Sequence, residues 1–233
     1  MKKIHFLTKI AALSAVLFCS MNSHAQDNSS AQERVAAAFR PTLEELAATS
    51  DIIGIAQVYY TDYEYRHNYP VSGRAYMRML ITYRSDETIN KFEVKEKGLH
   101  NGECYFPQTD YGSEGARFLV FLSHHPEGDY MGNPRLCMVP VAVTTDQGYA
   151  MPYPRPEINL TAVGEAAITE LNFQDVHATI DASDMTRSMA ARKAEELGGV
   201  VEDKKIVFNR GIPISVVRQL LGRENLKLPR SNR

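Results

Sequence analysis

One segment of the sequence concentrates side chains that are suited to recognition. Residues 59–69 contain five tyrosines, two carboxylates, an arginine and a histidine. Tyrosine gives a large contact area at a low cost in conformational entropy, so a tyrosine-rich segment is typical of a recognition surface. We predict a site for a ligand or partner protein that is formed by Asp62, Tyr63, Glu64, Tyr65, Arg66, His67 and Tyr69.

Two other interpretations of this segment stay open. The tyrosines would pack over one end of the folded domain while the charged side chains are merely solvated. Alternatively, Asp62, Glu64 and His67 would ligate a metal or act in catalysis, although their spacing matches no known arrangement of metal ligands. Because an apolar strand precedes the segment, we expect Tyr59 and Tyr60 to be buried. We expect the later tyrosines to be more exposed: Tyr63, Tyr65 and Tyr69.

The sequence contains none of the common catalytic motifs. It has no G-x-S-x-G, no P-loop, no G-x-G-x-x-G and no H-E-x-x-H. His124 and His125 are adjacent, so on one strand they would point to opposite faces and could not share a metal ion. We therefore predict no catalytic residues, no metal and no cofactor, and we favour a protein that is not an enzyme.

The N-terminus has the pattern of a cleavable secretory signal. Lys2 and Lys3 precede a short apolar run over residues 10–18, and small residues occupy positions 23 and 25. The apolar run is well short of the roughly 20 residues that a transmembrane helix needs. We predict a signal peptide over residues 1–25, a periplasmic or secreted product, and no transmembrane anchor after cleavage.

Export changes the expectation for the cysteines. Cys19 leaves with the signal peptide, so the mature chain keeps Cys104 and Cys137. Two cysteines in an oxidising compartment favour one disulfide bond, which needs Cα atoms within about 7 Å of each other. We predict a disulfide between Cys104 and Cys137, with two buried free thiols as the alternative.

Short apolar or alternating segments follow one another through the first part of the mature chain. They span residues 51–60, 74–84, 91–97, 116–122 and 136–145. The first is apolar on both faces, as a central strand would be, and the second alternates between apolar and polar residues. No helix long enough for a βαβ unit separates these segments. They predict an antiparallel β-barrel or sandwich over residues 42–150.

The segments that flank this barrel have a different character. Residues 26–41 form a polar and helical N-terminal segment, and Thr42-x-x-Glu45 has the pattern of a capping box. Three prolines make residues 151–157 a linker that cannot join a central sheet. Residues 158–222 read as a small α-rich region, which has helices over 184–197 and 215–221, a strand over 205–208 and a turn over 209–211. A flexible basic tail follows over 223–233.

Several barrel segments resemble those of the netrin-module and tissue-metalloproteinase-inhibitor-like group. The similar stretches are DIIGIAQV (51–58), FEV (92–94) before Gly98, and GARFLVFL (115–122). The resemblance covers roughly residues 43–145 and implies an OB-like barrel. The animal inhibitors of this group chelate zinc through an N-terminal cysteine, whereas the mature chain would begin at Gln26. The resemblance therefore implies the fold without the inhibition of proteases.

The charge composition of the chain limits the classes of molecule that it is expected to bind. The 233 residues include 26 basic and 28 acidic residues, for a formal net charge of −2. An acidic chain without a long basic run has few side chains that could bind the phosphates of nucleic acid. We therefore expect an exported, non-enzymatic interaction module that binds a protein or a cell-envelope component. An envelope hydrolase and a small-ligand carrier, each with its site near residues 59–69, stay open as alternatives.

The signal peptide gives the first testable prediction. Cleavage after Ala25 should leave Gln26 as the first residue, because positions 23 and 25 carry the small side chains that signal peptidase reads. Intact-mass measurement of the exported protein checks this. A membrane-bound species that retains residues 1–25 would contradict it.

Overall fold

The structure is a computed structural model that describes residues 40–98, 104–107, 115–126, 130–153 and 157–226. The chain divides into a compact unit over residues 41–233 and an N-terminal unit over residues 1–40. The predicted signal peptide, nearly all of the predicted segment 26–41, the prolines at 154 and 156 and the end of the predicted tail lie outside the described residues. The protein is mainly β, with 46% strand and 18% helix, and its described part has four α-helices.

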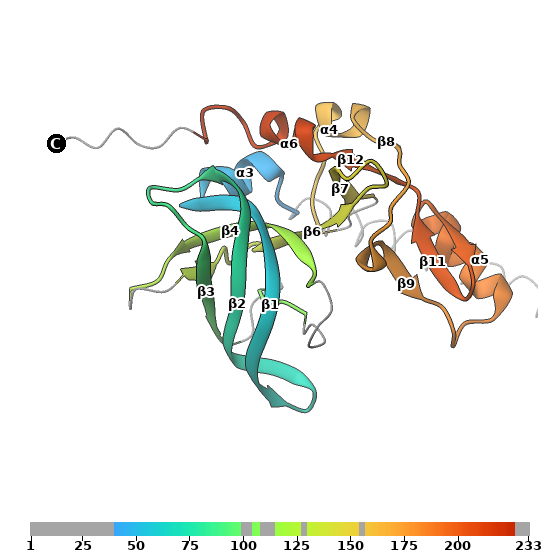
Figure 1. Cartoon of the computed structure of the whole chain (residues 1–233), viewed down its shortest axis with the longest axis horizontal. Helices are drawn as coiled ribbons and strands as arrows, with labels where there is room; N and C mark the ends of the chain where they lie inside the picture. The colour runs from blue at the N-terminus through green and yellow to red at the C-terminus, as the bar shows by residue number, and fades with distance from the viewer. Residues whose placement is uncertain (1–39, 99–103, 108–114, 127–129, 154–156, 227–233) are drawn as a thin grey trace, which may run out of the picture. The chain divides into compact units, whose positions relative to one another are not determined.

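Five strands close into a β-barrel (Figure 1). Around the barrel their order is β1-β2-β3-β5-β4, and β4 pairs with β1 again to complete the ring. Neighbours pair antiparallel except β3 and β5, which pair in parallel, so the sheet is mixed and the prediction of a wholly antiparallel barrel is wrong there. The strands are β1 (Ile52–Arg66), β2 (Tyr69–Arg84), β3 (Lys91–Lys97), β4 (Arg117–His124) and β5 (Tyr130–Gly132).

Strand β4 and the first part of β1, up to Val58, are buried on both faces, as the apolar pattern predicted for β1. Alternate residues such as Ile52 and Val120 point into the barrel. The residues between them, such as Ile53 and Leu119, pack outside it against the helices α3 (Leu43–Ala48) and α6 (Ile214–Leu220). The predicted capping box starts α3, because Thr42 Oγ1 accepts from Glu45 N at 3.1 Å and Thr42 N donates to Glu45 Oε2 at 3.0 Å.

Four further strands extend the sheet beyond β4, namely β6 (Met138–Val143), β7 (Tyr149–Pro152), β12 (Arg210–Pro213) and β8 (Thr169–Glu170). Met151 and Pro152 belong to β7 and pair with β12. The expectation that this proline-rich segment stays out of the sheet is therefore wrong for these two residues. The predicted turn at 209–211 is also wrong, because Arg210 and Gly211 begin β12. A Cβ at Gly211 would lie 2.6 Å from the carbonyl oxygen of Met151, so glycine permits this close approach.

The C-terminal region carries strands as well as helices. After α4 (Ala162–Ala166) and the 3-10 helix η1 (Val176–Ala178), three strands form a separate sheet in the order β10-β11-β9. The predicted helix and strand of this region are confirmed as α5 (Arg187–Glu196) and β11 (Lys205–Phe208). Helix α5 packs Ala190 and Ala194 against Ile206 of the sheet. The other strands are β9 (Thr179–Asp181) and β10 (Gly199–Glu202).

A buried ion pair joins the barrel to this region. Arg117, at the start of β4, donates to Asp175 Oδ2 at 3.1 Å, and their side chains are only 8% and 4% exposed. The same carboxylate accepts from Val143 N at 3.1 Å and from His177 N at 3.0 Å. Removing one partner of a buried pair typically costs about 3–5 kcal/mol, because the other charge stays buried. Asp175 therefore fixes β4, β6 and η1 to one another.

The two described cysteines are free and buried, and they are not at disulfide distance. The predicted disulfide between Cys104 and Cys137 is therefore wrong. The Cys104 thiol donates to the carbonyl of Asn133 at 3.5 Å. Burial, followed by the hydrogen bond to the Cys104 thiol, raises the pKa of Cys137 well above its usual value. A Cβ on Gly132 would lie 2.5 Å from Cys104 Sγ and 2.6 Å from Cys137 Cβ, so the barrel interior is tightly filled here.

These thiols give the second testable prediction. In the native protein neither cysteine should react quickly with an alkylating reagent, since both are buried. The raised pKa of Cys137 also leaves little of its thiolate. After unfolding without reductant, both should be alkylated. If the cysteines of the unfolded mature chain are alkylated only after reduction, the chain contains a disulfide between Cys104 and Cys137, and this prediction is wrong.

No helix in the described ranges is both long enough and apolar enough to cross a membrane.

Candidate functional site

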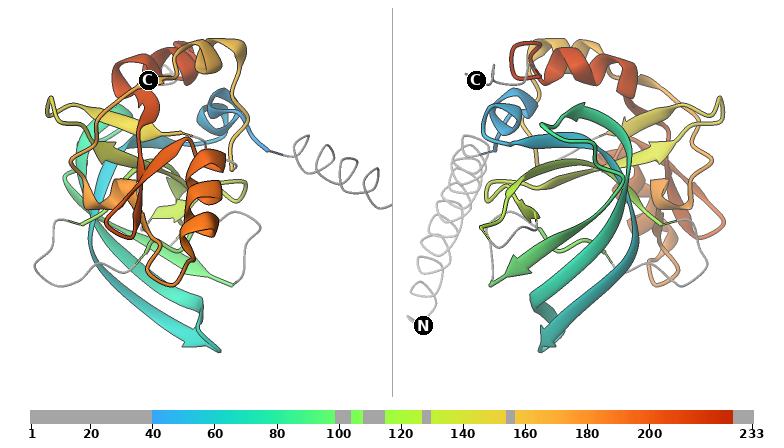
Figure 2. Two further views of the ribbon diagram at one scale, coloured as in Figure 1. Left: turned by 90° about the vertical axis from the view of Figure 1, so that its right-hand side faces the viewer. Right: turned by 60° about the vertical axis from the view of Figure 1, so that its left-hand side comes forward.

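Residues 59–69 form the end of a long β-hairpin. Strand β1 continues to Arg66 and β2 begins at Tyr69. His67 and Asn68 have φ values of 49° and 70°, as the two-residue turns of tight hairpins require. Strand β4 pairs with β1 only from Ile52 to Gln57. The end of the hairpin, beyond the last pairing of β2 with β3 at Ser72, projects from the barrel (Figure 2). We call residues 59–76 the hairpin arm.

Strand alternation separates the predicted site residues onto two faces. Asp62 and Glu64 lie on the outer face, opposite Arg74 and Ser72 of β2. Tyr63 points to the other face, where its hydroxyl accepts from Phe106 N at 3.1 Å. Burial raises the pKa of Tyr63 above its usual range. Tyr63 is therefore a structural residue, and the expectation that it is one of the more exposed tyrosines is wrong.

The tip of the hairpin arm keeps four of the predicted site residues together. Tyr65 is 52% exposed and Tyr69 is 68% exposed, as predicted. Arg66 pairs with Tyr69 across the hairpin, and His67 is exposed in the turn. The tip thus presents two tyrosine rings beside two groups that can donate hydrogen bonds.

A second group of tyrosines lies nearer the barrel, and one of its members was missed in the sequence. Tyr59 and Tyr60 were expected to be buried but are 51% and 40% exposed. The pairing passes from Val58 directly to Tyr60, so Tyr59 is the extra residue of a β-bulge, which redirects side chains. Both rings lie against Tyr76, at centroid distances of 6.3 and 5.5 Å. We call Tyr59, Tyr60 and Tyr76 the tyrosine cluster.

Polar contacts surround the tyrosine cluster on the outer face of β1, β2 and β3. Three hydrogen bonds cross the strands: Arg78 Nη2 to Gln57 Oε1 at 2.8 Å, Arg74 Nη1 to Glu93 Oε2 at 2.6 Å, and Ser72 Oγ to Glu64 Oε2 at 2.9 Å. The bond of Ser72 to Glu64 is exposed, whereas the two arginine bonds are partly buried. An exposed polar contact contributes little to stability.

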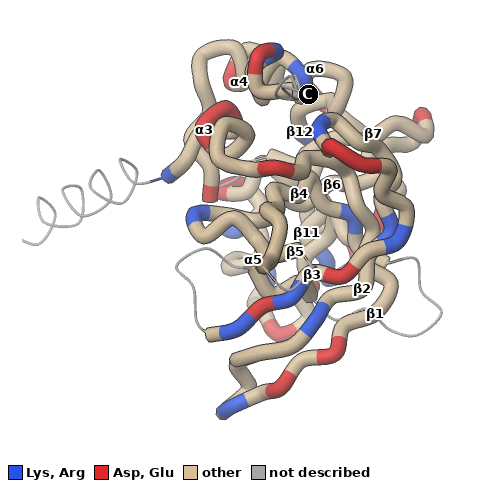
Figure 3. Tube along the Cα trace, turned by 90° about the vertical axis from the view of Figure 1, so that its left-hand side faces the viewer, with Lys and Arg blue, Asp and Glu red and all other residues tan. Residues whose placement is uncertain are grey.

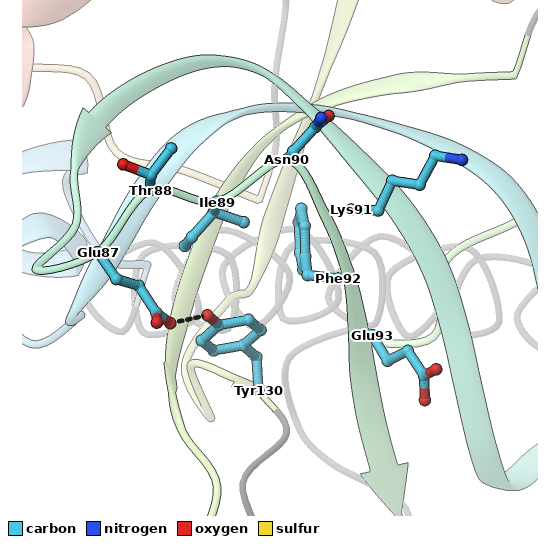
Figure 4. Close-up of a pocket in the computed structure, with 8 residues that line it drawn as sticks. All are labelled: Glu87, Thr88, Ile89, Asn90, Lys91, Phe92, Glu93 and Tyr130. Carbon is cyan, nitrogen blue, oxygen red and sulfur yellow. Dashed lines mark hydrogen bonds between the residues drawn. The ribbon is translucent and has the colours of Figure 1, made fainter.

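A pocket of about 330 Å³ lies beside the start of β3, where sequence patterns gave no signal (Figure 4). The Tyr130 hydroxyl donates to the Glu87 carboxylate, and the Phe92 ring meets the Tyr130 ring edge-on at 5.6 Å. Burial and the nearby Glu87 raise the pKa of Tyr130. Lys91 and Glu93 extend away from this pair (Figure 4). The pocket thus combines aromatic walls with hydrogen-bonding groups.

Within the ranges that the structure describes, no three His, Cys, Asp or Glu side chains are grouped to hold a metal ion. His124 lies at the end of β4, where its Nε2 is 3.3 Å from Asp86 Oδ1. His67 lies at the turn, beyond the outer-face positions of Asp62 and Glu64.

No model of a known protein family matches the chain, and a search of functionally described proteins also found no match. The surface chemistry of the hairpin arm and its surroundings is therefore the basis for assigning a function.

Proposed function

We propose that the protein is a non-enzymatic binding module of the cell envelope, and that the hairpin arm is its recognition surface. The observation that carries this proposal is the exposure of aromatic side chains. In the described part of the chain nine large hydrophobic side chains are exposed, and four of them are tyrosines of the arm: Tyr59, Tyr60, Tyr65 and Tyr69. Tyrosine is enriched among the residues that dominate binding energy at interfaces.

The order of the barrel strands supports an OB-like fold, whereas the proposed relationship to the netrin-like group is supported by the similar sequence stretches alone. A closed five-stranded ring in which β3 and β5 are parallel is the arrangement expected of an OB-type barrel. OB barrels bind ligands over the face of strands 2 and 3 and the loop that joins strands 1 and 2. The hairpin arm occupies the corresponding part of this barrel.

The predicted signal peptide supports a periplasmic or secreted location. The partner we propose is accordingly a protein or another component of the cell envelope. The pocket beside Tyr130 supports a second candidate function, the carriage of a small ligand.

The tip of the arm gives the third testable prediction. Tyr65→Ala and Tyr69→Ala should each weaken partner binding by more than about 1 kcal/mol, as aromatic interface residues do. Stability should change by less than about 0.5 kcal/mol, because both rings are exposed. The measurement is quantitative mass spectrometry of envelope components captured by the tagged mature protein, together with melting temperatures.

Two control variants separate recognition from folding. Met189→Ala removes an equally exposed side chain on α5 and should change neither capture nor melting. Tyr63→Ala should lower the melting temperature, since Phe106 N loses its acceptor and the Tyr105 ring loses an edge-on contact at 5.1 Å. The proposal fails if the Tyr65 and Tyr69 variants capture the same components, in the same amounts, as Met189→Ala.

A further inference from the structure

Like charges stand directly opposite each other on the outer face of β2 and β3. The register pairs Arg78 with Lys91, and Arg74 with Lys95. Directly opposed side chains of an antiparallel pair have Cβ atoms only about 4.5–5.5 Å apart, and like charges in such positions destabilise the pair. Two such pairs lie within the seven residues of β3, although Arg74 also forms an ion pair with Glu93 on the same face at 2.6 Å. Directly opposed like charges depart from the usual pattern of a sheet, which is expected where a surface serves a function.

An aromatic row separates the two basic pairs. Tyr76 lies between Arg74 and Arg78 on β2, and it is paired with Tyr60 on one side and Glu93 on the other. The two basic pairs lie four positions apart along the strand, which corresponds to about 13 Å. The face therefore presents two cationic positions with tyrosine rings between them.

The basic pairs lie in a chain that is acidic overall, with a net charge of −2. Basic side chains follow β2 and β3, where Lys97 extends the row, while Asp62 and Glu64 lie on the neighbouring strand β1 (Figure 3). The carboxylate of Glu93, in the aromatic row, is bound by Arg74 at 2.6 Å. Positive charge is thus concentrated on one part of the outer face.

We propose that this face binds an acidic oligosaccharide, which deepens the proposed binding function and rests on it. Its acidic groups would meet the Arg78–Lys91 and Arg74–Lys95 pairs, and a sugar ring between them would stack on the tyrosine cluster. Arginine and lysine both form strong, charge-assisted hydrogen bonds to carboxylates and phosphates.

Two other polyanions fit this face less well. An extended acidic peptide repeats its same-face side chains about every 6.7 Å, so an acidic residue would meet Glu93 in the aromatic row. Single-stranded nucleic acid carries a phosphate at every nucleotide, and its closely spaced charges would approach Asp62, Glu64 and Glu93. A chain that has an acidic group on every second sugar places a neutral ring at this row.

The test is titration calorimetry of the mature protein with hyaluronate oligosaccharides, which carry a carboxylate on every second sugar. Neutral dextran, poly-glutamate and single-stranded oligo-dT are the comparison ligands. Lys91→Gln/Lys95→Gln should weaken hyaluronate binding roughly tenfold or more, because both basic pairs lose a charge.

Lys204→Gln/Lys205→Gln is the matched control, because it removes two exposed lysines, one in the turn after β10 and one at the start of β11. It should bind hyaluronate as the wild type does. The inference is overturned if dextran, poly-glutamate or oligo-dT binds as well as hyaluronate, or if the two lysine variants behave alike. If hyaluronate does not bind while capture still depends on Tyr65 and Tyr69, this inference fails and the proposed function stands.

Discussion

The rest of the structure depends on the burial of β1 and β4 on both faces. Their inward residues complete the barrel interior, and their outward residues would be left in water by a barrel alone. Each fully buried aliphatic side chain contributes roughly 1.5–3 kcal/mol relative to an exposed one. The outer cover formed by α3, α6 and strands β7 and β12 is therefore part of the same folding unit as the barrel. The ion pair of Arg117 and Asp175 also joins the start of β4 to the N-terminus of η1.

The same constraint explains where the binding surface begins. Strand β1 is completely buried up to Val58, and at Tyr59 the bulge and the end of β4 pairing release it from the core. Beyond that point only β2 pairs with the strand, and its outward side chains are exposed, whereas Thr61 stays buried and Tyr63 is held by Phe106 N. The surface is thus anchored on a strand whose first seven residues are buried, which is how a rigid fold positions an exposed site.

Local patterns in the sequence predicted the parts of the fold that depend on neighbouring residues. The double-sided apolar run of β1, the alternation of β2, the Thr42–Glu45 capping box and helix α5 are all found where periodicity placed them. Features set by long-range pairing were not predictable: the parallel contact of β3 with β5, the strand at Arg210 and the separation of the two thiols. The candidate site was located in the right segment, but its division into two faces requires the hairpin register. The like-charge pairs of β2 and β3 become visible only in that register.

Hydrogen exchange of the native protein, resolved to individual amides, tests this account most directly. The account predicts that amides in Ile52–Gln57 and in β4 exchange only through global unfolding, because both faces and both edges of β1 are covered there. Amides of the arm from Asp62 to Arg66 should exchange through local opening, at a lower free energy. Equal protection along the whole of β1, or slower exchange in the arm than in Ile52–Gln57, would contradict the division of β1 into a buried anchor and an exposed recognition arm.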